Sequence, residues 1–530
     1  MSLNDLISDA LIRARTFGGQ ILDLSLPELL AALSDPDDDV ADFPRLQPHQ
    51  THPWHAFLVQ LAAIALDADH LAPEDMPGAD WATLLRALAP DEAWRLVVDD
   101  LSKAAFMQPA VLDGPAEPPE VLSPDLLDVL QSARNHDVKR RRMVHPEPEH
   151  WLHALIGVQT MQGYSGKMWY GIARMNGGLG NRPGVAVASS LRLGPRFRRD
   201  VAVLLEHRAD ITRMSGYQDH GGQALLWLQP WDGKTPIALA ECDPYFIEVC
   251  RRVRLRRLVS TGAIAAWTRN STAKRVDAPD ALKGITGDPW TPVELGDASK
   301  AMTLSGSGFT YEKTRQLIMQ EISAAPAQKL RTSDPLRMLW VAWALVRGQG
   351  KTEGLHERVV CLPGPVRKTL AVAAERDRLS KLAKDRVTTA GDVWSRGLSP
   401  ALAALASGGE PQKLERGRRG AHAGPWRSRF DEAVDRVFFE RLWEAVELPE
   451  EQADRAWKEE LLEQAARLLD EASTAAAGPE ARRLKGRAVA EMIILAIRAR
   501  MLPKDDDIVL ARAAESGDPL APTTQEELHV

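Results

Sequence analysis

Hydrophobic positions in the first hundred residues recur at the spacing of short helices. In residues 55–71 and 80–101, apolar side chains stand three and four positions apart, and Asp or Pro lies near the ends of each run. The segment 114–124 (GPAEPPEVLSP) is rich in proline, which suits neither a helix interior nor a central strand. We therefore expect short helices up to residue 101, followed by an irregular connection.

The middle of the chain carries patterns that favour strands. Small and β-branched residues dominate 184–193 (GVAVASSLRL), 224–229 (ALLWLQ) and 236–242 (PIALAEC), and Gly or Pro bounds these runs. Residues 243–258 (DPYFIEVCRRVRLRRL) are compatible with a strand or a helix, because their spacing does not decide between the two.

Long amphipathic segments follow residue 333. Strong helix formers fill their polar faces, and apolar residues recur at the helical period. The segments are 335–346, 366–387, 428–446, 450–473 and 479–502. Four or five such segments joined by short loops predict an antiparallel bundle. Residues 407–426 are Gly-rich and basic, so we expect a loop there that is either flexible or ordered by a partner.

Together these patterns predict an α+β protein with a mixed N-terminal globular domain followed by a C-terminal four-helix bundle. We place the boundaries at 1–333 for the α/β domain, 334–364 for a connecting segment, 365–505 for the bundle and 506–530 for a polar tail. A chain of 530 residues is too long for one ordinary core, which agrees with this division.

Composition indicates a globular, cytoplasmic protein. Hydrophobic residues make up 44% and charged residues 26% of the chain, and we expect no membrane contact because no apolar run reaches the length of a span. The first residues (MSLNDLISDALIRA) resemble an amphipathic helix rather than a signal peptide. Three cysteines (Cys242, Cys250 and Cys361) are too few for a disulfide framework or a four-cysteine zinc site. We expect no metal and no cofactor.

The net charge of −7 hides an uneven distribution along the chain. Residues 1–133 hold 6 Lys and Arg against 23 Asp and Glu, a net −17, whereas residues 134–275 hold 23 against 11, a net +12. The remaining residues contribute −2. A basic middle of this kind indicates a polyanionic partner.

Residues 348–352 (GQGKT) end like a phosphate-binding P-loop. The full pattern needs a glycine five positions before Gly350, and Leu345 stands there instead. That glycine lets the loop curl its backbone amides around a phosphate. The segment is therefore either a Gly-flanked tip that enters a groove or a solvated turn, with nucleotide binding as the less favoured alternative.

The segment 174–184 (RMNGGLGNRPG) has four glycines, which remove side chains where a backbone must approach a ligand closely. Asn176, Asn181 and Arg182 supply hydrogen-bond donors among them. Pro183 stands where the dinucleotide-binding pattern needs its third glycine, so that pattern fails. Backbone contact with nucleic acid suits the composition best, and a plain turn between strands is the alternative.

Residues 133–151 contain a basic run, Lys139 to Arg142, among several histidines. The run suits phosphate contacts, although a solvated charged segment explains it equally well. His136 and Asp137 allow an acid–base pair. His136 together with His145, His150 and His153 allows metal ligation, but no spacing matches a strong zinc pattern.

Five arginines between residues 251 and 257 form a basic stripe, which Arg269, Lys274 and Arg275 extend. Such a stripe suits nonspecific contact with a nucleic-acid backbone. No Ser-His-Asp set or nucleophile-elbow motif is visible in the sequence. We therefore do not expect an enzyme.

An ordered set of motifs resembles the CasA family, the large subunit of the type I-E CRISPR surveillance complex Cascade. The motifs are AFMQP from residue 105, ARNHDVK from 133, QTMQGYSGKMWYGIARMNGGLGNRP from 159, LLWLQPW from 225, ECDPYFIEVCRRVRL from 241, GDPWTP from 287 and RGQGKTEGLHER from 347. The C-terminal bundle matches the family in kind. No single motif is diagnostic, but their order is specific.

The resemblance implies a non-catalytic DNA-recognition subunit that serves in antiviral defence. Such a subunit checks the short protospacer-adjacent motif (PAM) from the minor groove, promotes strand separation and R-loop formation, and recruits a trans-acting helicase–nuclease. The implied partners are the backbone, small and guide-handle-binding subunits of Cascade, the CRISPR guide RNA and double-stranded target DNA. As in other RNA-guided systems, base pairing reads the sequence and protein reads the short motif.

The resemblance also implies sites. The family's PAM-reading glycine loop falls on Asn176, Gly177, Gly178, Leu179, Gly180, Asn181 and Arg182. Its groove-facing lysine falls on Lys274, with Arg275 as the alternative. Its wedge, a hairpin tip that enters the duplex, falls on Gln349, Gly350 and Lys351 within the connecting segment.

Two further groups complete the implied interface. The loop facing the guide RNA or the complex falls on Arg134, Asn135, His136, Lys139, Arg140, Arg141 and Arg142. Nonspecific DNA contacts fall to Arg251, Arg252, Arg254, Arg256 and Arg257. Some relatives carry a cysteine pair after the ECDP stretch, but Cys250 has no cysteine nearby here, so we expect no zinc.

Three hypotheses remain at this stage. The first is the Cascade large subunit, on the ordered motifs. The second is an unrelated nucleic-acid-binding assembly protein, on the basic middle alone. The third is a P-loop-like NTP-dependent enzyme, on GQGKT.

Overall fold

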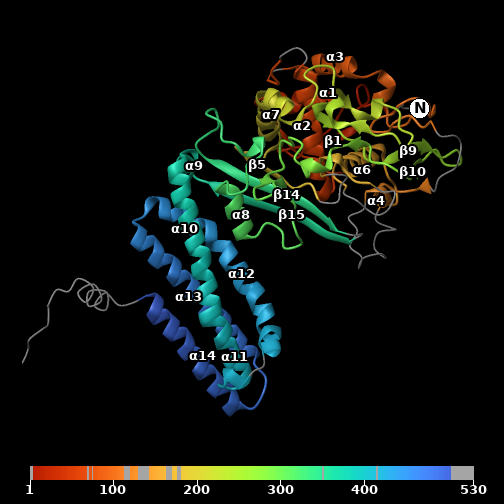
Figure 1. The fold of residues 1–530 in the computed structure, drawn as a ribbon. Coiled ribbons are helices and arrows are strands. Elements are labelled where there is room, and N and C mark those ends of the chain that lie inside the picture. The colour runs from red at the N-terminus through yellow and green to blue at the C-terminus, as the bar shows by residue number, and fades with distance from the viewer. Residues whose placement is uncertain are drawn as a thin grey trace, which may run out of the picture. The chain divides into compact units, whose positions relative to one another are not determined.

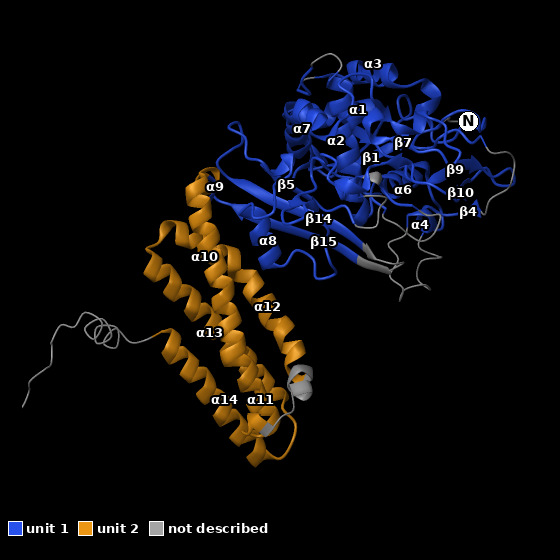
Figure 2. Cartoon of the chain, in the orientation of Figure 1, with its two compact units in different colours: residues 1–367 blue, residues 368–530 orange. Residues whose placement is uncertain are grey.

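The chain is described by a computed structural model over residues 4–67, 71–74, 76–112, 120–128, 143–162, 170–175, 181–348, 351–413 and 416–502 (Figure 1). Its contacts divide it into two compact units, Met1–Arg367 and Lys368–Val530 (Figure 2). Within the described residues, unit 1 mixes helices and strands, whereas unit 2 is helical. This confirms the predicted α+β class.

Helix α2 (Thr51–Asp67) forms the centre of unit 1. Every residue from His52 to Leu66 is buried, so the helix is enclosed on all sides, as expected for an element that is apolar all round. Helices α6 and α7 and strand β8 pack around it. Gln60 donates from Nε2 to the carbonyls of Tyr245 (3.0 Å) and Phe246 (3.1 Å), which ties β8 to this helix.

The other helices of unit 1 cover this core. The α-helices are α1 (Leu26–Ser34), α3 (Gly78–Leu88), α4 (Pro124–Leu127), α6 (Pro148–Thr160), α7 (Leu193–Ser215) and α8 (Tyr311–Ile318). Short 3-10 turns lie at Pro48–Gln50, Asp91–Trp94, Ala173–Met175, Leu226–Leu228, Leu239–Glu241, Asp280–Leu282 and Pro326–Gln328. Ser25 and Glu28 form a reciprocal capping box at the start of α1.

The strands of unit 1 form several small sheets. The strands are β1 (Ile12–Thr16), β2 (Ile21–Leu24), β3 (Val40–Asp42), β4 (Glu120–Val121), β5 (Gly184–Ala188), β6 (Gln223–Leu225), β7 (Ile237–Ala238), β8 (Cys242–Ile247), β9 (Arg252–Arg257), β10 (Ile264–Arg269), β11 (Val276–Asp277), β12 (Val293–Glu294), β13 (Lys300–Ala301), β14 (Met338–Gly348) and β15 (Lys351–Leu362). They are ordered β2-β1-β3, β4-β10-β9, β11-β7, β12-β13, β6-β8 and β15-β14-β5.

The sheet β15-β14-β5 contains the longest hairpin of the described chain. Strand β14 is its middle strand and pairs antiparallel with both neighbours, from Met338↔Leu362 to Gly348↔Lys351 on one side and from Leu339↔Ala188 to Trp343↔Gly184 on the other. Figure 1 shows the long arrows of β14 and β15 beside β5. The hairpin therefore belongs to the body of unit 1, because β5 comes from a part of the sequence about 150 residues earlier.

Unit 2 is a four-helix bundle. Helix α10 (Ala373–Asp392) continues through a π-helical stretch, Val393–Leu398, into α11 (Ser399–Ser407), and together they make one long rod. The other three rods are α12 (Arg416–Glu447), α13 (Glu450–Ala475) and α14 (Glu480–Met501), while α9 (Gly364–Ala371) leads into the bundle. Trp457 fills the core, where its ring meets Phe438 edge-on at 5.8 Å.

The structure corrects several sequence-based assignments. Residues 335–346 are not a helix but lie mostly in β14, because an apolar run that is largely buried on both faces has no periodicity that separates a strand from a helix. The predicted loop 407–426 is helical from Arg416, where α12 begins and continues to Glu447. The N-terminal stretch is not an amphipathic helix but leads into β1 at Ile12.

The strands predicted at 224–229 and 236–242 are mostly wrong, because Gln223–Leu225 and Ile237–Ala238 are short strands and a 3-10 turn follows each of them. The predicted helices 55–71 and 80–101 overlap α2 and α3, and the undecided stretch 243–258 forms β8 and β9. The strand predicted at 184–193 is shorter and ends at Ala188, before α7 begins at Leu193. Within the described residues, no helix is both long and apolar enough to cross a membrane.

Candidate nucleic-acid interface

The sheet β15-β14-β5 brings two of the predicted segments to the same end of unit 1. Strand β5 begins at Gly184, directly after the glycine-rich segment, and its first residue pairs with Trp343. Because the two strands are antiparallel, the chain before Gly184 lies toward the end of β14 that reaches Gly348. Both segments therefore leave the sheet at one end, and the hairpin extends about 17 Å beyond Trp343.

The base of the hairpin is fixed by a close contact between Gly184 and Trp343. A Cβ atom on Gly184 would lie 2.1 Å from Cε2 of the Trp343 ring, so only glycine fits under this ring. On α2, the His52 ring stacks on Trp343 with centroids 4.5 Å apart and planes 7° apart. This packing holds the hairpin against the central helix.

His52 adds a polar link to the outer strand. Its Nε2 lies 2.6 Å from Oε1 of Glu357 in β15. Burial lowers the pKa of His52 to about 4, although the Glu357 carboxylate favours protonation. The imidazole is therefore neutral at physiological pH and acts as a hydrogen-bonding spacer between α2 and the hairpin.

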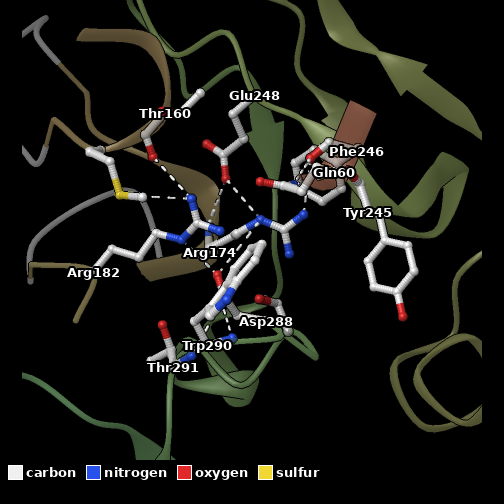
Figure 3. Close-up of polar contacts among 12 residues, drawn as sticks. Gln60, Thr160, Arg174, Arg182, Tyr245, Phe246, Glu248, Asp288, Trp290 and Thr291 are labelled. Atoms are coloured by element: carbon white, nitrogen blue, oxygen red, sulfur yellow. Dashed lines mark hydrogen bonds and ion pairs between the residues drawn. The ribbon is translucent and has the colours of Figure 1, made fainter. Parts of the chain in front are cut away.

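A buried ion cluster holds both ends of the glycine-rich segment (Figure 3). We call it the loop clamp and define it as Arg174, Arg182, Glu248 and Asp288. Arg182 Nε lies 2.7 Å from Oδ2 of Asp288, while Arg174 Nε lies 3.8 Å from Glu248 and 4.0 Å from Asp288. All four side chains are at most 5% exposed. The described residues on the two sides of 176–180 thus meet at one buried group of charges.

Backbone groups complete the clamp around Arg174. This guanidinium donates to the carbonyl of Phe246 at 3.0 Å and lies over the Phe246 ring, 4.2 Å from its centroid. Its own backbone N–H donates to Glu248 at 3.2 Å. Arg174 is therefore fixed to β8, which α2 fixes in turn.

Asp288 joins both arginines of the clamp to the backbone of the following turn. Its Oδ1 accepts the backbone N–H groups of Trp290 (2.9 Å) and Thr291 (3.2 Å), and its Oδ2 accepts from Arg182. Burial alone would raise the pKa of Asp288. The charges of Arg182 and Arg174, together with these hydrogen bonds, hold the pKa below its usual value. Asp288 is therefore ionised and compensates the two arginines.

Asn181 binds the end of the glycine-rich segment to the irregular stretch that follows β13. Its Nδ2 donates to the carbonyl of Leu304 at 2.6 Å, and its Oδ1 accepts the Leu304 N–H at 3.1 Å. Asn181 and Arg182 are each 6% exposed. Of the residues predicted to meet DNA, these two hold the segment in place instead, because their side chains are buried and bonded to other parts of the protein.

The rest of the predicted PAM loop, Asn176, Gly177, Gly178, Leu179 and Gly180, lies outside the described residues. The predicted loop facing the guide or the complex, Arg134 to Arg142, lies outside them as well. The two arginines of the loop clamp border residues 176–180 in the sequence.

Lys274 and Arg275 have different surroundings. The Lys274 side chain is 25% exposed, and its Nζ lies 3.4 Å from Oδ1 of the exposed Asp280. Arg275 is buried and donates to the carbonyls of Leu226, Gln229 and Pro230. Burial lowers the pKa of Arg275 to about 10. Of this pair, only Lys274 has a side chain positioned to meet a ligand.

The wedge residues Gln349 and Gly350 lie outside the described residues, and Lys351 begins β15. A P-loop requires a helix directly after its Gly-Lys-Thr, so that the helix N-terminus faces the phosphate. Here a strand follows and pairs with the strand before it. The fold therefore argues against the P-loop hypothesis.

The arginines of the predicted basic stripe differ in their burial. Arg251 and Arg254 are each 3% exposed. Arg254 donates to the carbonyls of Val98 (2.8 Å), Asp100 (3.1 Å) and Lys103 (2.9 Å), and burial lowers its pKa to about 10. The structure thus differs from the sequence expectation at these two residues, which crosslink the core. Arg252, Arg256 and Arg257 are half-buried at the surface.

Of the histidines considered as metal ligands, His136 lies outside the described residues, and the other three are described. His150 accepts the backbone N–H of Glu147 at 3.0 Å, and His145 is exposed. His153 is buried, with its ring edge-on to Trp54 at 5.1 Å. Among the described residues, no group of three or more His, Cys, Asp or Glu is arranged to hold a metal.

Sequence inspection missed the acidic half of the loop clamp. Glu248 stands in an apolar run between Ile247 and Val249, and Asp288 stands next to Pro289 and Trp290. A carboxylate is rarely buried unless it is paired with a cation. A carboxylate among apolar residues therefore indicates a buried basic partner, and this was the signal in the sequence. Both residues lie inside motifs quoted for the family resemblance.

Comparison with solved structures identifies the fold. The chain superposes on Cse1 from Acidimicrobium ferrooxidans with a TM-score of 0.63 at 14% identity, covering 94% of this chain and 98% of that chain. It superposes on Thermus thermophilus CasA (Cse1) with a TM-score of 0.60 at 16% identity, covering 94% and 98%.

A chain from a structure of a CRISPR RNA-guided surveillance complex gives a TM-score of 0.53 at 12% identity, covering 92% of this chain and 99% of that chain. No protein-family profile matches the sequence, and no curated protein matches it either. Because the likeness extends over nearly the whole length of both chains, this protein has the CasA (Cse1) fold.

The loop clamp generates a stability prediction. In Asp288→Asn, two buried arginines lose one of their two carboxylates, so we expect the free energy of unfolding to fall by about 3–5 kcal/mol. Hydrogen exchange should become faster at residues 170–175 and 181–188. Asp297→Asn, in an exposed loop, is the control and should change neither quantity. If Asp288→Asn has the free energy of unfolding and the hydrogen-exchange rates of wild type, these residues do not clamp the segment.

His153 generates a pH prediction. Burial lowers its pKa to about 3, and neither ring nitrogen has a hydrogen-bond partner among the described residues. Between pH 6.5 and about 3 the unfolded chain binds a proton that the folded chain does not, so this residue lowers stability as the pH falls. We therefore expect the free energy of unfolding of His153→Leu to exceed that of wild type at pH 5. The gain is up to about 1.4 kcal/mol for each pH unit below 6.5.

Urea denaturation at pH 7 and pH 5 measures this difference. His145→Gln, at an exposed position, is the control and should follow wild type at both pH values. If His153→Leu and wild type differ by the same amount at both pH values, His153 does not bind its proton as described.

Proposed function

We propose that this chain is the non-catalytic large subunit of an RNA-guided CRISPR surveillance complex of the Cascade type. The CasA (Cse1) fold over 94% of the chain supports this proposal. The ordered motifs also support it, since two of them contain Glu248 and Asp288, the carboxylates of the loop clamp. The observation that carries the proposal is the common exit of the glycine-rich segment and the hairpin tip at one end of the sheet β15-β14-β5.

In this proposal residues 176–180 read the PAM from the minor groove, while Asn181 and Arg182 anchor them. A groove about 6 Å wide admits a glycine backbone more readily than bulky side chains, and its hydrogen-bonding pattern is degenerate. A loop held at both ends by buried ion pairs loses little conformational freedom when it binds. Lys274 supplies a cation beside the groove. Tolerance of several related motifs follows from backbone readout.

The hairpin tip at residues 349–351 then acts as the wedge. Unstacking one base step costs a few kcal/mol, and exchange of the DNA duplex for an RNA–DNA heteroduplex is nearly balanced beyond that step. A wedge therefore needs only to lower the barrier to opening. The packing of Trp343 between Gly184 and His52 provides a rigid base for it.

The remaining contacts of the proposal are with partners. Residues 134–142 would face the guide RNA or neighbouring subunits, and the bundle of unit 2 would present surface to the backbone, small and guide-handle-binding subunits. A separate helicase–nuclease, recruited in trans, would cut the DNA. The chain itself would hold no metal or cofactor and would catalyse no step.

Reconstitution tests this proposal. The chain is combined with the other Cascade-type subunits and a guide RNA, and binding of matching duplex DNA is measured with and without the chain. We expect PAM-dependent binding to require it. Binding that is indifferent to the chain would favour the unrelated assembly protein. Specific ATP binding that Lys351→Ala abolishes would favour the P-loop enzyme.

Glycine replacement in the reading loop gives a sharper prediction. Gly177→Val and Gly178→Val should weaken PAM-dependent binding by about 10-fold or more, because a side chain blocks close backbone approach to the groove. Binding to a duplex without the motif should change less than about 2-fold, because phosphate contacts supply it. Electrophoretic mobility shifts at one fixed salt concentration measure both.

Gly296→Val is the matched control, since an added Cβ there meets no atom within 4 Å. It should leave both affinities unchanged. Equal losses on the two duplexes for Gly177→Val and Gly178→Val would show that the loop does not read the motif.

A further inference from the structure

Strands β9 and β10 form an antiparallel ribbon whose two faces differ in chemistry. Val253 and Leu255 of β9 belong to the hydrophobic core, so one face is turned inward. Residues at alternate positions occupy the opposite face. We call this the outer face and define it as Arg252, Arg254 and Arg256 of β9 with their partners Arg269, Trp267 and Ala265 of β10.

The centre of the outer face is held rigid. Arg254, opposite Trp267, is crosslinked to three carbonyls of the segment 98–103, which covers the middle of the ribbon. Arg252 on one side donates from Nη1 to the carbonyl of Asn270 at 3.0 Å. The surface groups of this face therefore stand on a fixed support.

Trp267 and Arg256 form a preassembled stack on this face. The Arg256 guanidinium lies over the Trp267 ring, 3.3 Å from its centroid, and both side chains are half-buried. Unpaired nucleobases stack on aromatic rings such as indole and on guanidinium planes. The arrangement thus combines a flat surface with a positive charge.

A narrow crevice runs beside this stack, between the ribbon and the segment 101–111. Leu101, Pro109 and Val111 form one wall, and Trp231 and Trp267 form the other. Its enclosed space is about 20 Å³, enough for about one water molecule. Sites for cofactors and drug-sized ligands need ~300–1,000 Å³. A ligand must therefore lie across the mouth of the crevice and cannot be engulfed by it.

Arg252 and Arg269 line this mouth from paired positions at the far end of the ribbon from Arg256. Cations therefore stand on both sides of Trp267 along the strands. Successive phosphates of an extended strand need cations spaced in this way, with an aromatic ring between them for a base. A duplex cannot use the ring, because its base faces are already stacked on one another.

We infer that the outer face of the β9–β10 ribbon binds single-stranded nucleic acid, with an unpaired base stacked on the Trp267–Arg256 pair and the phosphates near Arg252 and Arg269. This site is distinct from the proposed PAM-reading loop and from the hairpin tip. It binds a strand only after the bases have separated.

Fluorescence anisotropy on the isolated full-length chain tests the inference without any other subunit. The probes are labelled oligothymidylate and a labelled hairpin duplex of equal nucleotide number, at the same salt concentration. Trp267→Ala should weaken single-strand binding by roughly 10-fold or more, the usual loss for one stacked base. Duplex binding should change less than about 2-fold.

Two milder variants keep the test decisive if Trp267→Ala folds poorly. Trp267→Phe retains an aromatic ring and should keep most of the single-strand affinity. Arg256→Gln removes the stacked cation and should lower single-strand affinity and flatten its salt dependence. Glu120→Gln, which removes a negative charge paired opposite Trp267 on β4, should strengthen binding slightly.

Unit 2 offers a matched control. Arg429 lies over the Trp426 ring, 4.8 Å from its centroid, but Arg429 is also paired with Glu471 and has no arginine-bearing strand beside it. Trp426→Ala should leave both affinities unchanged. Equal loss of single-strand and duplex binding in Trp267→Ala, no loss at all, or the same loss in Trp426→Ala would overturn the inference.

A third probe, oligouridylate, separates the two sources of an unpaired strand. Binding of either oligonucleotide supports the site. A preference for oligothymidylate favours displaced DNA as the ligand, and a preference for oligouridylate favours guide RNA. Because the assay contains no PAM and no guide complex, failure of PAM reading would leave its result unaffected.

Discussion

The buried ion pair between Arg182 and Asp288 is the interaction on which the candidate interface depends. Two arginines, Arg174 and Arg182, stand on either side of a segment that has few side chains of its own. Their charges are buried, and burial is tolerable only because Asp288 and Glu248 compensate them. A glycine-rich segment has the largest conformational entropy to lose on ordering. Fixing both of its ends in the core limits that loss before any ligand arrives.

The same constraint explains the layout of unit 1. Glu248 directly follows β8, Asp288 comes from the turn before Trp290, and β8 is bonded to the central helix α2 through Gln60. Helix α2 also supports the hairpin β14–β15, through His52 stacked on Trp343. The two segments proposed to meet duplex DNA therefore share one support. A single rigid body that carries both a reading loop and a wedge can couple recognition of a motif to opening of the base pairs next to it.

The sequence predicted the α+β class and the bundle, because helical periodicity is strong over long amphipathic segments such as 450–473. It failed for residues 335–346, where burial on both faces of β14 removes the periodicity. Charge was the least reliable guide. Arg251, Arg254 and Arg275 look like their neighbours in a basic stripe, yet they are buried and bonded to the protein, whereas Arg256 reaches the surface. Strand alternation does not separate Arg254 from Arg256, because the two lie on the same face of β9; Arg254 is buried because it is bonded to the segment 98–103, which is far away in the sequence. Asp288 and Glu248 were visible only as carboxylates in apolar surroundings.

Electron cryomicroscopy of the reconstituted complex on a target duplex tests the central claim most directly, namely that one clamped end of the sheet β15-β14-β5 meets the DNA. The account predicts density for residues 176–180 in the minor groove beside the motif and for residues 349–350 next to the first separated base pair, with Asp288 still bonded to Arg182. A duplex bound elsewhere on the chain, with both segments away from the DNA, would contradict the account.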